Sequence, residues 1–140
     1  ILDFIHSQRI CVLALEMLDG SPHASTVHFA FDEESKTFFF ETYNTYRKAE
    51  VLFKKDVVRT SVVVGFDENN MKTLQLDGIA QLIRDDEREF FDKIYFDKFP
   101  NKKEKSADPK FVKFSFVPKW WRYTDWTNKE GKQIISSEDK

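Results

Sequence analysis

The chain has 140 residues, a length typical of one domain that buries a sizeable core. A net charge of −2 argues against general nucleic-acid binding, and no apolar stretch approaches the ~20 residues of a membrane-spanning helix. The single cysteine, Cys11, cannot form an internal disulfide, so we expect a reduced, cytoplasmic setting.

The first 42 residues predict the end of a short helix and then three antiparallel strands. The helix end lies at residues 1–6 and the strands at 9–17, 23–31 and 37–42. The residues Asp19-Gly20-Ser21-Pro22 predict the turn of a hairpin between the first two strands. Alternation in the second strand puts Ala24, Thr26, His28 and Ala30 on one face.

The third strand runs directly into a predicted helix, at residues 46–55, through the sequence ETYNTYRK. Asn44 or Thr45 is a good N-cap, and the apolar positions of the helix are Ala49, Val51, Leu52 and Phe53. Arg47 and Lys48 fall in its first turn, where the helix dipole favours acidic residues. This mismatch predicts a bound anion, with phosphate as the best candidate, whereas two solvated surface cations are the alternative.

The second half predicts three further strands and one amphipathic helix. The strands lie at residues 57–66, 72–84 and 111–126, and the helix, with Phe90, Phe91, Ile94 and Tyr95 as its apolar stripe, at 85–98. Asp77-Gly78 indicates a bulge where another backbone comes close, or else a hairpin turn. Pro118 indicates an edge strand or a bulge.

We interpret residues 101–110 as a solvated loop and residues 127–140 as a flexible tail, which leaves a single domain at residues 1–126. Short strands between turn signals, with long bent members, favour a small barrel over a sandwich. The predicted fold is therefore mainly β: a six-stranded antiparallel β-barrel, closed or split, with helices.

Three motifs in this order resemble the FMN-binding split barrels of the pyridoxamine 5′-phosphate oxidase-like superfamily. They are DGSPHASTVHF at 19–29, ETYNTYRK at 41–48 and LQLDGIA at 74–80. The resemblance covers nearly the whole chain and implies FMN at the interface of a homodimer. It also implies an FMN-dependent oxidoreductase acting on an unknown small molecule. The charge and the short apolar runs predict no nucleic-acid or membrane partner.

The resemblance assigns the cofactor-binding residues position by position. Thr42, Arg47 and Lys48 match the phosphate-binding residues, while Thr26, Val27 and His28 match the strand beside the flavin ring. The remaining matches are Thr73, Gln75 and the ring-covering aromatic Trp121, with Trp120 and Trp126 as other candidates for that last role.

The sequence departs from the pyridoxamine phosphate oxidases proper at Ala24, Tyr46 and Thr73, where that family usually has a basic residue, serine and glutamine. Its substrate-gripping C-terminal pattern is also absent. His28 is a candidate proton donor, with an ordinary strand histidine as the alternative. No catalytic residue or metal ligand is assigned. A non-catalytic protein that binds or senses flavin, haem or deazaflavin is therefore the alternative function.

Overall fold

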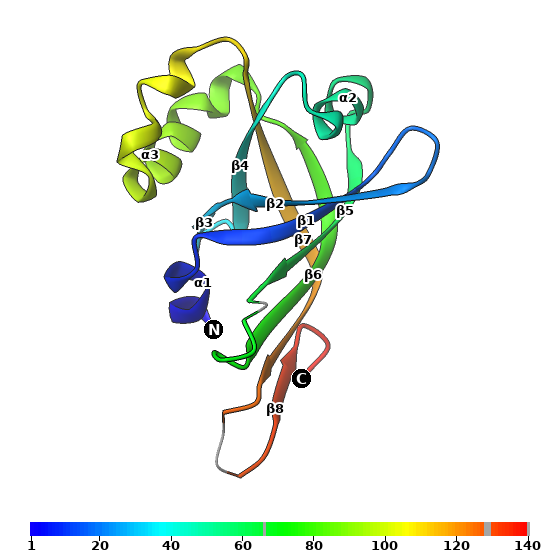
Figure 1. The fold of residues 1–140 in the computed structure, drawn as a ribbon, viewed down its shortest axis with the longest axis vertical. Helices are drawn as coiled ribbons and strands as arrows, with labels where there is room; N and C mark the ends of the chain where they lie inside the picture. The colour runs from blue at the N-terminus through cyan, green and yellow to red at the C-terminus, as the bar shows by residue number, and fades with distance from the viewer. Residues whose placement is uncertain (66, 128–129, 140) are drawn as a thin grey trace.

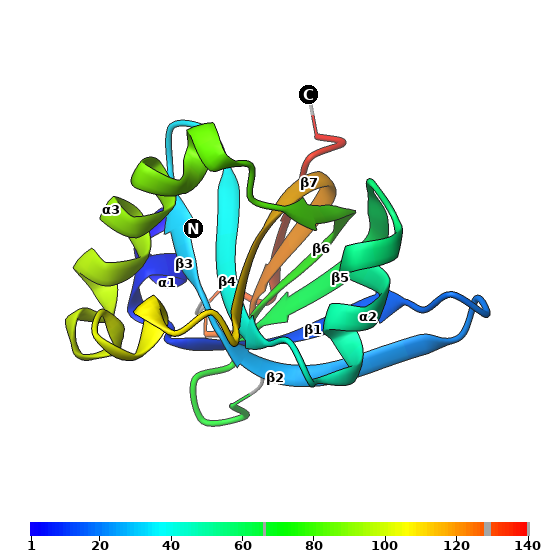
Figure 2. The same ribbon diagram turned by 90° about the horizontal axis from the view of Figure 1, so that it is seen from above.

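The computed structural model describes residues 1–65, 67–127 and 130–139. Within these residues, eight strands form one antiparallel sheet that curls into a half-barrel, with three α-helices around it (Figure 1, Figure 2). The mainly β, split-barrel prediction is confirmed. The described strands number two more than predicted because one predicted strand is broken and the C-terminal segment adds another.

The strands are β1 (Ile10–Glu16), β2 (Pro22–His28), β3 (Ala30–Asp32), β4 (Thr37–Tyr43), β5 (Val58–Val64), β6 (Lys72–Leu82), β7 (Phe111–Asp125) and β8 (Gln133–Ser136). The helices are α1 (Leu2–Ser7), α2 (Arg47–Lys54) and α3 (Arg88–Lys98), and short 3₁₀ helices lie at 85–87, 100–102 and 105–107. Across the sheet the order is β2-β1-β5-β6-β7-β4-β3, and β8 pairs with β7.

Large aromatic side chains fill the concave side of the sheet. Phe38 and Phe40 of β4 point inward, and the Phe40 ring stacks on that of Phe114 at a centroid distance of 5.1 Å. The intervening Phe39 points to the other side of β4, where it packs edge-on against Phe91 of α3. This second, smaller cluster fixes α3 against the outer side of β4 and thereby positions the segment that follows the helix.

The predicted bulge at Asp77-Gly78 is confirmed. Asp77 pairs with Trp120 and Gly78 with Pro118, so Lys119 is an extra residue in β7. Both explanations for the proline hold at this position. Pro118 lies at the bulge, and β4 pairs only with residues 111–116 of β7, so Pro118 has a described strand partner on one side alone.

The predicted strand at 23–31 is broken at Phe29. This residue is fully buried, and its N–H donates to the carbonyl oxygen of Arg9 at 3.1 Å. The chain leaves β1 here and joins β4 as β3, so Ala30 is buried under α3 and does not continue the exposed face of His28.

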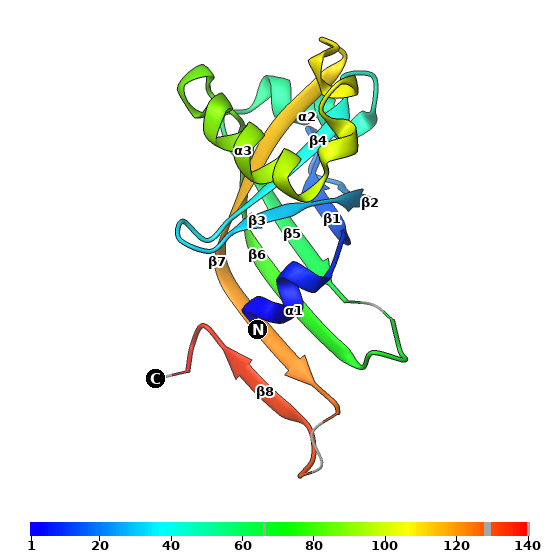
Figure 3. The same ribbon diagram turned by 90° about the vertical axis from the view of Figure 1, so that its left-hand side faces the viewer.

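The segment predicted as a loose tail contains β8, which pairs with residues 122–125 of β7 (Figure 3). The prediction missed this pairing because it depends on the length of β7. Strand β4 covers only residues 111–116 of β7 and leaves the same edge of the later residues open to another strand.

Lys98, in the last turn of α3, places its ammonium 4.1 Å from the centre of the Phe29 ring and donates to the carbonyl oxygen of Gln8. Burial, followed by the charge of Arg9, lowers the pKa of Lys98 to about 8. The unfolded chain therefore binds more protons than the folded one above pH 8, and the free energy of unfolding should rise with pH there.

We expect Lys98→Met to flatten this rise between about pH 8 and pH 9, measured by urea unfolding at several pH values. The window ends at pH 9 because burial also raises the pKa of the Cys11 thiol to about 12, which lowers stability at higher pH. Lys93→Met, on an exposed position of the same helix, is the control and should keep the wild-type slope. An equal slope in Lys98→Met and wild type would contradict the assignment.

Candidate functional site

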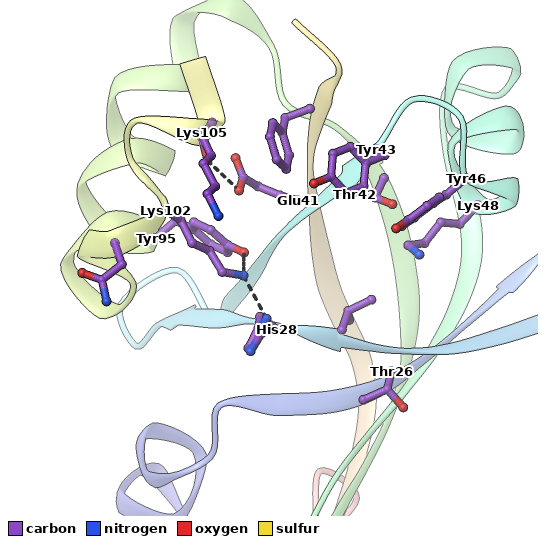
Figure 4. Close-up of a pocket in the computed structure, with 14 residues that line it drawn as sticks. Thr26, His28, Glu41, Thr42, Tyr43, Tyr46, Lys48, Tyr95, Lys102 and Lys105 are labelled. Carbon is purple, nitrogen blue, oxygen red and sulfur yellow. Dashed lines mark hydrogen bonds between the residues drawn. The ribbon is translucent and has the colours of Figure 1, made fainter. Parts of the chain in front are cut away.

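A pocket of about 420 Å³ lies between β2, the end of β4, the start of α2 and the segment after α3 (Figure 4). One end, here called the α2 end, is formed by Thr42, Tyr43, Tyr46 and Lys48. The other, the α3 end, is formed by His28, Glu41, Tyr95, Asn101, Lys102, Lys105 and Ser106. Thr26, Val27 and Phe111 complete the lining.

The α2 end forms where β4 turns into the helix. The prediction of Asn44 or Thr45 as N-cap is wrong: Tyr46 is the N-cap, and no side chain caps the helix. Asn44 lies two residues before the N-cap, and its N–H donates to the carbonyl oxygen of Lys110, just before β7, at 2.7 Å. The positive end of α2 is therefore left without a side-chain acceptor.

The two cations of the first turn have different surroundings. Arg47 is exposed, whereas Lys48 is only 7% exposed and its ammonium lies 4.9 Å from the centre of the Tyr46 ring. Burial lowers the pKa of Lys48. Phe53, predicted on the apolar face, is instead 58% exposed. The buried face of α2 therefore contains an ammonium where the sequence pattern predicted only apolar side chains.

Thr42 provides a second polar group at this end. Its hydroxyl oxygen Oγ1 is buried and has no hydrogen-bond partner among the described residues. A buried hydroxyl, a buried ammonium and an uncapped helix N-terminus together form a set of donors suited to a phosphate group. The residues present thus fit the phosphate of a nucleotide-like cofactor.

Lys102 connects three elements at the α3 end. Its ammonium lies 2.9 Å from Nδ1 of His28 and 3.3 Å from the Tyr95 hydroxyl oxygen (Figure 4). An ammonium only donates, so Nδ1 accepts and the proton of the neutral His28 ring resides on Nε2. Burial, followed by the charges of Lys102, Arg9 and Lys98, lowers the pKa of His28, which favours this neutral ring.

Glu41 is the acidic side chain of the pocket lining. Its Oε1 accepts a hydrogen bond from Ser106 Oγ at 2.8 Å, while its Oε2 is buried without a partner among the described residues. Burial raises the pKa of Glu41, although the Ser106 hydrogen bond and the charges of Lys113 and Lys102 oppose the effect. The net effect makes this carboxyl group easier to protonate than an exposed one.

The structure brings some predicted site residues together and leaves others apart. Those around the pocket are Thr26, Val27, His28, Thr42 and Lys48, whereas Arg47 is exposed and is not among the lining residues. Thr73, Gln75 and Trp121 lie outside it in this chain. Trp121 lines a separate apolar cavity with Leu74 and Leu76, and the hydroxyl of Thr73 contacts the carbonyl oxygen of Val64.

Several lining residues were missed by the sequence analysis. The interpretation of residues 101–110 as a solvated loop is wrong in part, because Lys102 and Lys105 face the pocket. Lys102 and Lys105 look like ordinary loop lysines in the sequence, and the contact of this segment with β2 and β4 depends on the docking of α3. Tyr95 was placed correctly on the apolar face of its helix, but its hydroxyl also reaches the pocket.

The described residues provide neither a membrane-spanning helix nor a metal-binding cluster. No helix in that part of the chain is both long and apolar enough to cross a membrane. No cluster of three or more histidine, cysteine, aspartate or glutamate side chains there is arranged to hold a metal ion.

Solved structures with the same fold belong to proteins that are named for different ligands, either haem or FMN. A haem-binding protein from Mycobacterium smegmatis is 15% identical, with a TM-score of 0.76 over 96% of this chain and 54% of its own. The haem storage protein HutZ from Vibrio cholerae is 20% identical, with a TM-score of 0.69 over 84% and 87%. An FMN-binding protein from Nostoc punctiforme is 14% identical, with a TM-score of 0.65 over 91% and 80%.

These identities establish a shared fold only. The chain spans about half the length of the Mycobacterium protein and of a further match from Agrobacterium tumefaciens. No curated protein matches the sequence. The family model for pyridoxamine 5′-phosphate oxidase matches residues 1–125, and the chain belongs to this family.

Proposed function

We propose that this protein binds FMN, with the phosphate at the α2 end of the pocket, and acts as an FMN-dependent oxidoreductase on a small molecule. The observation that supports this best is that buried Lys48 and Thr42 both line the pocket at the N-terminus of α2. Among the described residues, the Thr42 hydroxyl has no hydrogen-bond partner and no side chain caps the helix. Burying a cation without a counter-charge is costly, and a phosphate supplies that charge.

The contacts with FMN would come from α2, β4 and β2, which surround the pocket. Lys48, Thr42 and the first N–H groups of α2 would hold the phosphate, with Arg47 reaching it from the exposed side. The β2 residues at 26–28 would orient the flavin ring. FMN supplies the hydride or electron transfer when bound, and the chain binds it, orients it and excludes water.

We also propose that the protein is a homodimer with the cofactor at its interface. Thr26 of β2, Val12 of β1, Val63 of β5 and Gln75 of β6 form one row across the outer face of the sheet. A second copy covering this face would explain how Gln75, which lies outside the pocket of one chain, contributes to a cofactor site. Trp121 pairs with Leu76 and packs against the core on the concave side, so this face does not include it. It would also cover Ile10, which is 36% exposed at the end of β1.

Haem is the second candidate ligand, because a histidine faces the pocket. The structure makes iron ligation by His28 costly: Nε2 carries the proton while Lys102 donates to Nδ1, so coordination requires that contact to break. FMN needs no such change. The residues of the α2 end would bind the phosphate of a deazaflavin in the same way as that of FMN. The cytoplasmic setting stays a prediction, which depends on the single buried cysteine.

The visible spectrum of the purified protein tests the proposal. We expect flavin absorption bands, either as purified or after addition of FMN and removal of unbound ligand, and a mass in solution of two chains. Turnover of a reduced nicotinamide with an acceptor would establish the oxidoreductase. A colourless protein that takes up haem but not FMN would overturn the FMN assignment.

A further inference from the structure

The α3 end of the pocket holds polar groups that FMN phosphate at the α2 end would not use. Glu41 Oε2 is buried, and no described residue forms a hydrogen bond with it. Among the described residues, the Lys105 ammonium and the Asn101 amide have neither a hydrogen bond nor an ion pair. Lys102 donates to His28 and Tyr95 and has a third proton to give. Figure 4 shows Glu41, Lys102 and Lys105 gathered at this end.

The charges at this end do not cancel. Lys102 and Lys105 contribute two positive charges and Glu41 at most one negative charge. Lys113, which lies nearby, is paired with Asp92 at 2.7 Å and adds little net charge. Once a phosphate has neutralised Lys48, the α3 end keeps a net positive charge, and a ligand with a single negative charge balances it.

The carboxyl group of Glu41 adds a second requirement for the ligand, which is a hydrogen-bond donor. Oε1 is occupied by Ser106, so Oε2 is the atom that remains for a ligand. A buried carboxylate oxygen without a donor is costly, and an N–H or O–H group of a ligand would satisfy it. A ligand cation is a poor match because two ammonium groups lie at the same end.

We propose that the α3 end is the substrate subsite of the pocket and that it selects a small organic monocarboxylate bearing an N–H or O–H donor. Lys102 and Lys105 bind the carboxylate, and Glu41 Oε2 accepts the hydrogen bond from the donor. Phe111 supplies aromatic surface for the body of the ligand. The assignment of this end to the substrate rests on the proposed function, since FMN is taken to occupy the other end.

Three probes test the two requirements separately: benzoate, which has only the carboxylate; 3-aminobenzoate, which adds an N–H donor; and 3-aminobenzamide, which lacks the charge. Binding is measured by calorimetric titration on the protein with and without FMN. We expect 3-aminobenzoate to bind about tenfold more tightly than benzoate and 3-aminobenzamide to bind at least about tenfold more weakly than 3-aminobenzoate.

Two variants assign these preferences to side chains. Lys105→Gln should weaken both carboxylates about tenfold, while Lys103→Gln, an exposed neighbour outside the pocket lining, should leave them unchanged. In Glu41→Met no oxygen remains to accept from the ligand amine, so the preference for 3-aminobenzoate over benzoate should disappear.

The outcomes separate this inference from the FMN proposal. Binding of 3-aminobenzoate that depends on Lys105 and Glu41 in a protein that refuses FMN would support the subsite and overturn the cofactor. A protein that binds FMN but shows equal affinity for the three probes, or affinities unchanged by Lys105→Gln, would overturn the subsite and leave the cofactor assignment intact.

Discussion

Lys48→Gln is expected to weaken FMN binding by about 10- to 150-fold, because a hydrogen bond to a charged group contributes about 1.5–3 kcal/mol. The side chain is 7% exposed, so water cannot replace the lost charge at the phosphate. Affinity is measured by quenching of flavin fluorescence on titration. Riboflavin, which lacks the phosphate, should bind wild type and variant equally, and this comparison isolates the phosphate contact from any change in the ring site.

Two further variants on α2 sharpen the test. Arg47→Gln should cause a smaller loss of FMN affinity, since exposed charge pairs contribute only about 0.2–1 kcal/mol. Lys54→Gln, an exposed change in the last turn of the same helix, should have no effect. A larger loss in Arg47→Gln than in Lys48→Gln would place the phosphate on the outer side of the helix. Equal loss of riboflavin and FMN would exclude a phosphate site at Lys48.

Local sequence patterns predicted most of the fold. The turn at residues 19–22, the β-branched run of β5 and the bulge at Asp77-Gly78 each have a local physical cause, and each occurs in the structure. The errors depend on distant contacts. The break at Phe29 requires β1 and β4 to lie apart, and β8 requires an open edge on β7. Neither the separation of β1 from β4 nor the open edge of β7 can be recognised from the local sequence around Phe29 or β8.

In the candidate site, too, some features have a local signal in the sequence and others depend on tertiary packing. Arg47 and Lys48 were identified because a basic first turn opposes the helix dipole, which is a local signal. Their unequal burial was not predictable, because it depends on how α2 packs on the sheet. Lys102 and Lys105 reach the pocket only because α3 docks on Phe39 and carries the following segment toward β2. The α3 end is therefore a product of tertiary structure.

Gly78→Ala is expected to lower the free energy of unfolding strongly. A Cβ atom at this position would lie 2.1 Å from the carbonyl oxygen of Val117 and 2.9 Å from the Cα of Pro118. Both are backbone atoms, so the contact is relieved only if β6 and β7 separate at the bulge. We expect a loss of at least about 3 kcal/mol in the free energy of unfolding, measured by urea denaturation.

Gly20→Ala is the matched control because Gly20 has free space for a Cβ atom but a left-handed φ, whereas Gly78 has no such space and no left-handed φ. At Gly20 the Cβ would meet no atom within 4 Å, but the φ of +85° is unfavourable for alanine and costs about 1–2 kcal/mol. Gly78 has no left-handed φ, so its requirement is for space alone. A smaller loss in Gly78→Ala than in Gly20→Ala would mean that the strands do not approach this closely. Because Gly78 lies outside the pocket lining, the folded fraction of Gly78→Ala should still bind FMN with wild-type affinity, which separates the stability of the sheet from the chemistry of the site.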